Sequence, residues 1–219
     1  PMQVSSKKVC RMPSLSVIIP CFNDADKLPR LLSSFHTSSG DSVVAVDDGS
    51  AVPVDLRYPR VIRHEKNQGP AAARNTGVAA TQSDYVFFAD ADVILAPGIL
   101  DRFRMILDTA PPTTVGIFGD FVWDNIRYAL GPFDYAKLLQ RNLISPMSMW
   151  RREALGLFRD TLYEDWDLWL RILNPDKHPG RTVVYDPVLV FATTGRRRSQ
   201  HLPSVRATSS GIEILKKGS

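Results

Sequence analysis

Residues 84–95 read DYVFFADADVIL, and this stretch decides how the rest of the chain is interpreted. Tyr85 to Phe88 form a short apolar run of β-favouring side chains, which predicts a buried strand. The strand ends in Asp90 and Asp92, two carboxylates one residue apart. Such a pair is costly unless something neutralises it, and hard divalent cations bind carboxylate oxygens. Because ligands of open α/β sheets sit beyond the carboxyl ends of strands, the stretch predicts a metal and nucleotide platform. A solvated D-x-D loop is the plainer alternative.

The composition is that of a soluble globular domain. The chain has 219 residues, of which 44% are hydrophobic and 23% charged, enough for one domain with a full core. No apolar run reaches the ~18 residues that cross a membrane, and the first one, 15–19, is too short for a signal peptide. The net charge of +4 suits an anionic ligand such as a diphosphate without requiring nucleic acid. Cys10 and Cys21 fit no metal spacing and are interpreted as free thiols, so we expect a cytoplasmic protein.

Strand and helix patterns alternate along the chain, which predicts an α/β domain with a mostly parallel central sheet flanked by helices. Residues 1–13 are expected to be a flexible lead-in, residues 14–195 the single Rossmann-like domain, and residues 196–219 a basic tail that folds over the nucleotide or stays solvated. We expect Pro20 to end the first strand. The expected strands are 15–19, 42–46, 60–63, 85–88, 114–119, 147–150, 182–185 and 188–191, and the expected helices are 26–38, 69–80, 97–107, 134–140 and 164–173.

Two further motifs follow the first two expected strands. After the first, Phe22 of the Pro20–Asn23 segment is free to lie against a flat base. After the second, the acids of Asp47-Asp48-Gly49-Ser50 lie in a tight turn with acceptors pointing outward, where a carboxylate can accept from a base N–H. Taken singly, each is an ordinary turn.

The remaining two motifs open helices. Gly69 begins a helix whose free N–H groups and positive end suit a phosphate, and Arg74 on that helix is a planar donor able to reach a base or a phosphate. In 163–171, Tyr-Glu-Asp-Trp-Asp-Leu-Trp-Leu-Arg, tryptophans anchor a helix in the core and leave Glu164 and Asp165 facing a cleft. A surface arginine and simple helix capping are the plainer alternatives.

Taken together and in this order, SVIIPCFN, VDDGS, NQGPAAARNTG, FADADV and LYEDWDLWLR resemble the inverting glycosyltransferases of family 2, which have the GT-A fold. The resemblance covers residues 15–171, roughly three quarters of the chain. It implies an enzyme that takes a nucleotide-activated sugar with Mn²⁺ or Mg²⁺ and passes the sugar to a hydroxyl. A UDP-hexose is the favoured donor, followed by GDP-mannose or a dTDP-sugar. The acceptor is a glycan, lipid or protein-linked group that the sequence does not identify. The chain is near the minimum length for the fold, which leaves open that it is one domain of a longer enzyme.

The resemblance also assigns roles by position. Asp165 matches the general base, with Glu164 beside it, and Asp90 leans towards the ribose while Asp92 binds the metal. Which of Asp47 and Asp48 contacts the base stays open. The implied nucleotide-binding residues are Pro20, Phe22, Asn23, Asp47, Asp48, Gly69, Arg74, Asp90 and Ala91; the implied metal ligands are Asp90, Asp92 and His201; and the implied donor and acceptor pocket comprises Ser145, Met147, Ser148, Trp166 and Arg198. A plain core strand at 145–151 and a solvated basic tail at 196–204 are the alternatives for the last group and for His201.

Other classes fit less well. A sugar nucleotidyltransferase needs a glycine-rich phosphate loop after the first strand, where Pro20 to Asn23 stands instead. A dehydrogenase needs G-x-G-x-x-G after a strand, and neither that pattern nor a P-loop occurs. A non-catalytic module that binds nucleotides or polyanions through the basic tail is the rival from a different class.

Overall fold

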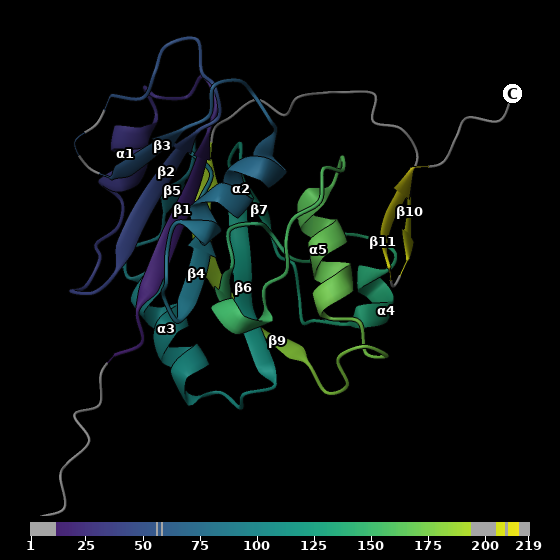
Figure 1. Ribbon diagram of the computed structural model, residues 1–219. Helices are drawn as coiled ribbons and strands as arrows, with labels where there is room; N and C mark the ends of the chain where they lie inside the picture. The colour runs from purple at the N-terminus through teal and green to yellow at the C-terminus, as the bar shows by residue number, and fades with distance from the viewer. Residues whose placement is uncertain (1–11, 56, 58, 194–204, 209, 215–219) are drawn as a thin grey trace, which may run out of the picture.

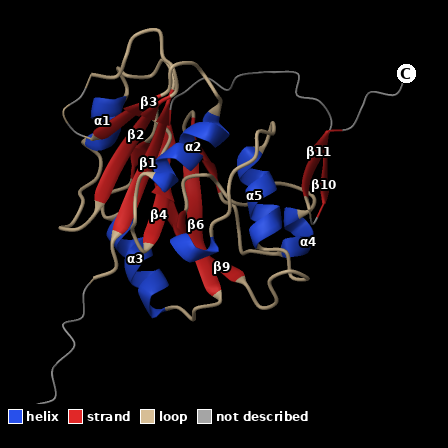
Figure 2. Cartoon of the chain, viewed as in Figure 1, coloured by secondary structure: helices blue, strands red, loops and turns tan. Residues whose placement is uncertain are grey.

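The computed structural model describes residues 12–55, 57, 59–193, 205–208 and 210–214. Within them, a nine-stranded sheet in the order β3-β2-β1-β4-β8-β6-β9-β5, with β7 added on β6, forms the centre of the molecule (Figures 1 and 2). The strands of this sheet are β1 (Leu15–Cys21), β2 (Ser42–Asp47), β3 (Arg60–Arg63), β4 (Tyr85–Phe88), β5 (Ile94–Leu95), β6 (Thr114–Trp123), β7 (Ile126–Tyr128), β8 (Met149–Arg151) and β9 (Thr182–Thr193).

The sheet is mixed, and its amino-terminal half is parallel. β3, β2, β1 and β4 run in one direction, β8 runs antiparallel between β4 and β6, and β6 pairs parallel with β9. This confirms the predicted α/β class with its mostly parallel sheet. Because β1, β2 and β4 are parallel, their carboxyl ends meet at one edge, and the segments that follow Cys21, Asp47 and Phe88 lie together there.

Helices cover both faces of the sheet (Figure 1). One core cluster joins alternate β1 residues such as Val17 to α1 and α3, and the other joins Ile18 to α2 and α5. The period-2 alternation of a strand buried on both faces explains why consecutive β1 residues serve different layers. The helices of the described residues are α1 (Leu28–Leu32), α2 (Pro70–Ala79), α3 (Ile99–Thr109), α4 (Tyr135–Leu138) and α5 (Glu164–Ile172), and Arg152–Ala154 form a 3₁₀ turn.

The first strand is longer than predicted, because Pro20 lies inside it. Pro20 and Cys21 pair with Val46 and Asp47 of β2. Ile18 faces β4, since its carbonyl accepts from the Ala89 amide at 3.0 Å, so two residues later Pro20 also faces β4. The pairing with β4 stops at Ile18, and the missing N–H of Pro20 therefore leaves no partner unsatisfied.

Helix α1 ends well before the predicted residue 38. It occupies only Leu28–Leu32, and the Ser33 and Ser34 hydroxyls then bond the carbonyls of Pro29 and Leu31 at 2.8 and 2.6 Å. Serine side chains that bond nearby backbone offer the chain an alternative to continued helix. The apolar spacing that predicted a longer helix reflects Phe35, which packs against the core from the following turn.

The two predicted strands at 182–185 and 188–191 are one strand, β9, that carries an irregularity. The pairing shifts from Gly119 opposite Asp186 to Asp120 opposite Leu189, so residues between them bulge out. Pro187 lies in that bulge and is exposed, which accommodates its missing amide. The short strands β5 and β7 were not predicted, since runs of two and three residues carry little periodic signal.

A hairpin lies beside α5 at the carboxyl-terminal end of the described chain (Figures 1 and 2). It pairs β10 (Val205–Thr208) antiparallel with β11 (Gly211–Ile214). The Arg159 guanidinium donates to the Ser210 carbonyl at 3.1 Å and joins the hairpin to the segment before α5. The hairpin falls within the predicted tail, 196–219. Among the described helices, none has the length and apolar character needed to cross a bilayer.

Candidate functional site

A cleft of about 1010 Å³ opens at the carboxyl edge of β1, β2 and β4. It also receives residues from the start of α2, from Trp123 of β6 and from the start of α5. The topology therefore brings the sequence motifs to one place, as expected for an open α/β sheet. The predicted site residues that line the cleft are Pro20, Phe22, Asp48, Gly69, Arg74, Asp90, Ala91, Asp92 and Glu164.

Arg74 joins three separate parts of the chain inside this cleft. Its side chain is only 5% exposed, and its two terminal nitrogens donate to Glu164 Oε1 at 2.5 Å and to Asp90 Oδ1 at 3.1 Å. Burial disfavours the guanidinium charge, but Asp90, Glu164 and Asp165 together hold the pKa of Arg74 above its usual value. A buried arginine is stable here because it is paired. It is therefore not the surface arginine of the plainer alternative.

Asp165 lies at the first turn of α5. Glu164 lines the cleft as predicted, but Asp165, which was expected to face it too, is not among the residues that line it. Burial and the neighbouring Glu164 carboxylate raise its pKa to about 6, against the opposing effects of Arg74, of the Trp166 backbone N–H and of Asn142. The Asn142 amide donates to Asp165 Oδ2 at 2.9 Å. A carboxyl group that titrates this close to neutrality is suited to exchange protons with a substrate.

Asp90 and Asp92 follow β4 and face the cleft. The pKa of Asp92 is raised by burial first and then by the Asp90 charge, while Lys27 opposes the shift. A divalent cation beside both carboxylates would favour the ionised form of Asp92, which burial and the Asp90 charge disfavour. In the part of the chain that the structure describes, no three His, Cys, Asp or Glu side chains cluster as a complete ligand set. A cation at this pair would thus need further oxygens from phosphate or water.

The two acids of the 47–50 turn have different surroundings. Asp47 is fully buried and accepts from the backbone N–H groups of Ser50 and Val54 at 2.9 and 3.0 Å, and it also pairs with Arg63. Burial alone would raise its pKa, but these hydrogen bonds outweigh burial and hold the pKa below its usual value. Asp47 is thus committed to the turn and does not line the cleft.

Asp48 lines the cleft and organises the entry to α2. Its carboxylate accepts from the backbone N–H groups of Gln68 and Gly69 at 3.0 and 2.8 Å, and it lies 2.6 Å from His64 Nδ1. Gly49 beside it has a φ of +75°, and an added Cβ would collide with the backbone of residues 66–67. The VDDGS turn can therefore pass this close to the α2 loop only because glycine follows the two acids.

The Asn23 side chain forms part of a turn, where it accepts a backbone hydrogen bond. It adopts a φ of +57°, its backbone N–H donates to Ser50 Oγ at 2.9 Å, and its side-chain oxygen accepts from the Ala51 N–H at 2.9 Å. These bonds join the loop after β1 to the loop after β2. Phe22 is 39% exposed and lines the cleft, so its ring is available to a ligand.

A second pocket of about 560 Å³ adjoins the cleft and shares Asp90 and Trp123 with it. One wall is a column of stacked rings, in which the centre of the Phe121 ring lies 4.9 Å from that of Tyr128 and 5.1 Å from that of Phe191. Of the predicted pocket residues, Ser145 and Met147 line it. The roles of Asn142, Phe121 and Tyr128 in this pocket were not predicted, because these residues fall in the aromatic segment 120–145, which shows no clear period.

The other predicted pocket residues lie elsewhere. Ser148 is buried and its hydroxyl accepts from Trp150 Nε1 at 2.8 Å, and Trp166 is buried with its indole donating to the Leu138 carbonyl at 2.7 Å. Both stabilise the core and line neither the cleft nor the second pocket. Arg198 and His201 lie outside the described residues, so their proposed roles stay predictions.

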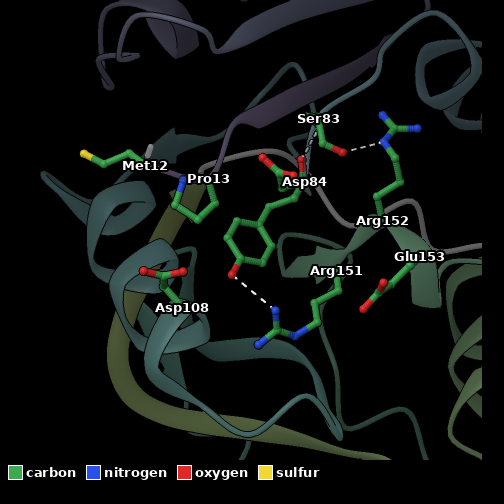
Figure 3. Close-up of a pocket in the computed structure, with 9 residues that line it drawn as sticks. Met12, Pro13, Ser83, Asp84, Asp108, Arg151, Arg152 and Glu153 are labelled. Carbon is green, nitrogen blue, oxygen red and sulfur yellow. Dashed lines mark hydrogen bonds between the residues drawn. The ribbon is translucent and has the colours of Figure 1, made fainter. Parts of the chain in front are cut away.

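Figure 3 shows a further pocket, of about 590 Å³, at the amino-terminal ends of β1 and β4. Its arginines are committed to the fold. Arg151 donates to the Tyr85 hydroxyl at 3.3 Å and to the Leu107 carbonyl at 2.6 Å, and Arg152 donates to the Ser83 carbonyl at 2.8 Å. None of the predicted site residues lines this pocket, and the chemistry therefore concentrates at the opposite edge of the sheet.

Residues 16–156 match the family model of Glycosyl transferase family 2, which covers well over half of the chain. The chain belongs to glycosyl transferase family 2. An uncharacterized family relative, a glycosyltransferase of Haemophilus influenzae, is 36% identical over 93% of this chain and 76% of its own length. The pre-mycofactocin glycosyltransferase of Mycobacterium tuberculosis is 43% identical over 94 residues, which are 40% of this chain and 19% of that protein.

Solved glycosyltransferases share the fold. Staphylococcus aureus TarS 1–349 superposes with a TM-score of 0.66 at 21% identity, over 83% of this chain and 60% of TarS 1–349. The mannosyltransferase PcManGT of Pyrobaculum calidifontis, in complex with GDP-Man and Mn²⁺, superposes with a TM-score of 0.65 at 19% identity, over 87% of this chain and 59% of its own. TarS 1–349 has also been solved with UDP-GlcNAc. At these identities the likeness shows the GT-A fold alone, and this chain spans about three fifths of each neighbour.

Proposed function

We propose that this family 2 domain transfers a sugar from a nucleotide-sugar to a hydroxyl group, with a divalent cation and with inversion at the anomeric carbon. The observation that carries the proposal is the Arg74 bridge. It places Asp90 of the acidic pair and Glu164, the neighbour of Asp165, on one guanidinium in one cleft. Such a transfer needs two components: a pair of carboxylates that binds a cation, and a carboxyl group whose pKa lies near neutrality.

The donor nucleotide would lie along the edge of β1, β2 and β4. Phe22 would pack on the base, and Asp48 would accept from a base N–H, since Asp47 is already enclosed by its turn. At the start of α2 the Gly69 N–H already donates to Asp48 and Pro70 has no N–H, so an anion would be attracted by the positive end of the helix and not by the Gly69 N–H. The family neighbours solved with UDP-GlcNAc and with GDP-Man support a nucleotide-sugar, and a UDP-hexose remains our first expectation.

Asp90 and Asp92 would hold Mn²⁺ or Mg²⁺, in keeping with the Mn²⁺ of the PcManGT complex. A bound cation at this pair supplies charge neutralisation for a leaving diphosphate. Trp123 and Asp90 border both hollows, so a sugar held between them would face the second pocket. Asp165 would remove the proton of an acceptor hydroxyl that enters from that pocket. A single displacement from the opposite face inverts the configuration. His201 and Arg198 are proposed to close over the diphosphate.

Metal-dependent nucleotide binding tests the cation site. We expect one of UDP, GDP and dTDP to raise the melting temperature only with Mn²⁺, because a ligand at ~100 times its Kd adds roughly 2.7 kcal/mol to the folded state. Asp92→Ala should lose this Mn²⁺-dependent shift. Asp101→Ala is the control, since Asp101 lies on α3 with a side chain that is 66% exposed.

An Asp92→Ala protein that keeps the full Mn²⁺-dependent shift would contradict the cation site. Absence of any nucleotide shift in the folded parent protein would favour the non-catalytic binding module instead, and nucleotide-sugar turnover then separates the two classes directly.

A further inference from the structure

Asn142 is a side chain whose orientation is fixed from both ends of its amide. Its Oδ1 accepts from the Ile144 backbone N–H at 3.2 Å. Its Nδ2 donates to Asp165 Oδ2 at 2.9 Å. The backbone donor fixes which end of the amide faces Asp165, because a reversed amide would place two donors against each other. Asn142 also lines the second pocket, which Asp165 itself does not line, so the amide links the carboxylate to the wall of that pocket.

The charged groups around Asp165 leave a specific task for this amide. Glu164 on the same helix disfavours the Asp165 charge, and Arg74 from α2 favours it. The terminal nitrogens of Arg74, however, donate to Glu164 and to Asp90. Among the described residues, the side-chain donor to the Asp165 carboxylate is therefore Asn142.

We infer that Asn142 is a positioning residue for the transfer reaction: its amide holds the Asp165 carboxylate beside the second pocket, in the ionised form that accepts a proton. The inference rests on the proposed function. In that step the acceptor hydroxyl gives its proton to Asp165 and its oxygen bonds to the anomeric carbon. The bond from that carbon to the phosphate oxygen breaks, and its electron pair leaves with the diphosphate.

The direction of the effect follows from the hydrogen bond. A donor to the ionised carboxylate lowers the pKa of that group, and here it opposes burial and Glu164. Without the amide, the pKa of Asp165 would rise further above 6, and less of the protein would carry a working base at neutral pH. Raising the pH would restore the ionised form.

The test is the pH dependence of nucleotide release from the active nucleotide-sugar. For Asn142→Ala we expect the acid-side inflection of kcat to move up by about one pH unit, the effect of one charge-assisted hydrogen bond. The kcat should therefore fall about tenfold at pH 5 but only about twofold at pH 7. The KM for the donor should stay unchanged, and kcat should recover towards the parent value above pH 8. Gln140→Ala is the matched control, since it removes an exposed amide two residues away.

Asn142→Asp sharpens the test, because it replaces the donor with a like charge and should move the inflection further than Asn142→Ala. An unchanged inflection in both variants, or a loss that high pH does not recover, would overturn the inference. If the parent protein turns over no donor, the proposed function fails. The Asp165 carboxyl carbon can then be titrated by NMR, with Asp165→Asn to assign its signal. An equal pKa in parent and Asn142→Ala proteins would still refute the inference.

Discussion

At Asp165, burial and the Glu164 charge oppose ionisation, while Arg74, a backbone N–H and Asn142 favour it. The balance leaves the group with a pKa of about 6, where a carboxyl group passes from acid to base within the physiological range. The residue is thus tuned by its neighbours rather than by its position in a motif alone.

The rate of sugar transfer should follow the ionisation of Asp165. We expect kcat to rise about tenfold per pH unit below pH 6 and to level off above it, because only the ionised carboxylate accepts a proton. A pH series of initial rates checks this. A rate that is flat from pH 4.5 to 8 would contradict the base role.

The raised pKa of Asp165 also makes the stability of the folded protein depend on pH. The folded-state pKa of Asp165, about 6, lies above the unfolded value of 3.8, so the folded protein binds this proton more tightly. The contribution to stability is greatest at low pH and is lost as the pH rises from about 4 to 6. Above that range Asp165 is ionised, so this contribution to stability is absent, and the ionised form is the one that can accept a proton.

Arg74 is the residue whose loss should affect the fold most within the site. Arg74→Leu leaves Glu164 and Asp90 without their shared cation, and removal of one partner from a buried ion pair costs about 3–5 kcal/mol. We expect the lower end, since the Asp90 side chain is 35% exposed. Urea unfolding measures the change, with the exposed Arg30→Leu as control. Equal midpoints for the two variants would contradict the bridging role.

At the scale of elements, close packing of α2 on β1 determines where the start of α2 lies relative to the cleft. Gly77 is buried on α2, and a Cβ at this position would collide with the Ile18 side chain of β1. The small side chains of the alanine-rich α2 also let this helix lie close to the sheet. Its start at Gly69 then reaches the cleft.

Gly77→Ala should destabilise the protein, although alanine is the better helix former by about 1 kcal/mol. Overpacking at the Ile18 contact costs about 1–3 kcal/mol and outweighs that preference. A double-mutant cycle with Ile18→Ala tests the cause. Because Ile18→Ala removes the side chain that the added methyl group would meet, the double variant should lose less stability than the sum of the two single losses. Additive losses would contradict the steric explanation.

Elements with strong local signals were predictable, and those set by distant partners were not. Tyr85–Phe88 and Arg60–Arg63 were predicted with their observed bounds, since apolar runs between turn residues carry their own signal. Pro20 inside β1 was not, because its tolerance depends on where β4 stops. The bulge in β9 likewise depends on its pairing with β6.

At the scale of the whole molecule, both ligand-sized hollows near Asp165 open at one edge of the sheet and share Asp90 and Trp123. The sequence predicted those residues of this edge that belong to the motifs recognised by their order along the chain. It did not predict Asn142 or the stacked rings of Phe121, because these contacts are made by a segment without periodicity. The structure also gives the two acids of the 47–50 turn different surroundings, since Asp48 lines the cleft and Asp47 does not.

Turnover of nucleotide-sugars with Mn²⁺ shows directly whether this domain transfers sugar with Asp165 as the base. A panel of UDP-, GDP- and dTDP-sugars is incubated with the parent protein and with Asp165→Asn, and the released nucleotide is measured. We expect the parent protein to release one class of nucleotide. Asp165→Asn should lose ~10²–10⁴-fold of this activity, the usual contribution of a positioned base, and should retain nucleotide binding. Release by Asp165→Asn at the parent rate would contradict the base role of Asp165, and a folded parent protein that binds a nucleotide but turns over no donor would contradict sugar transfer itself.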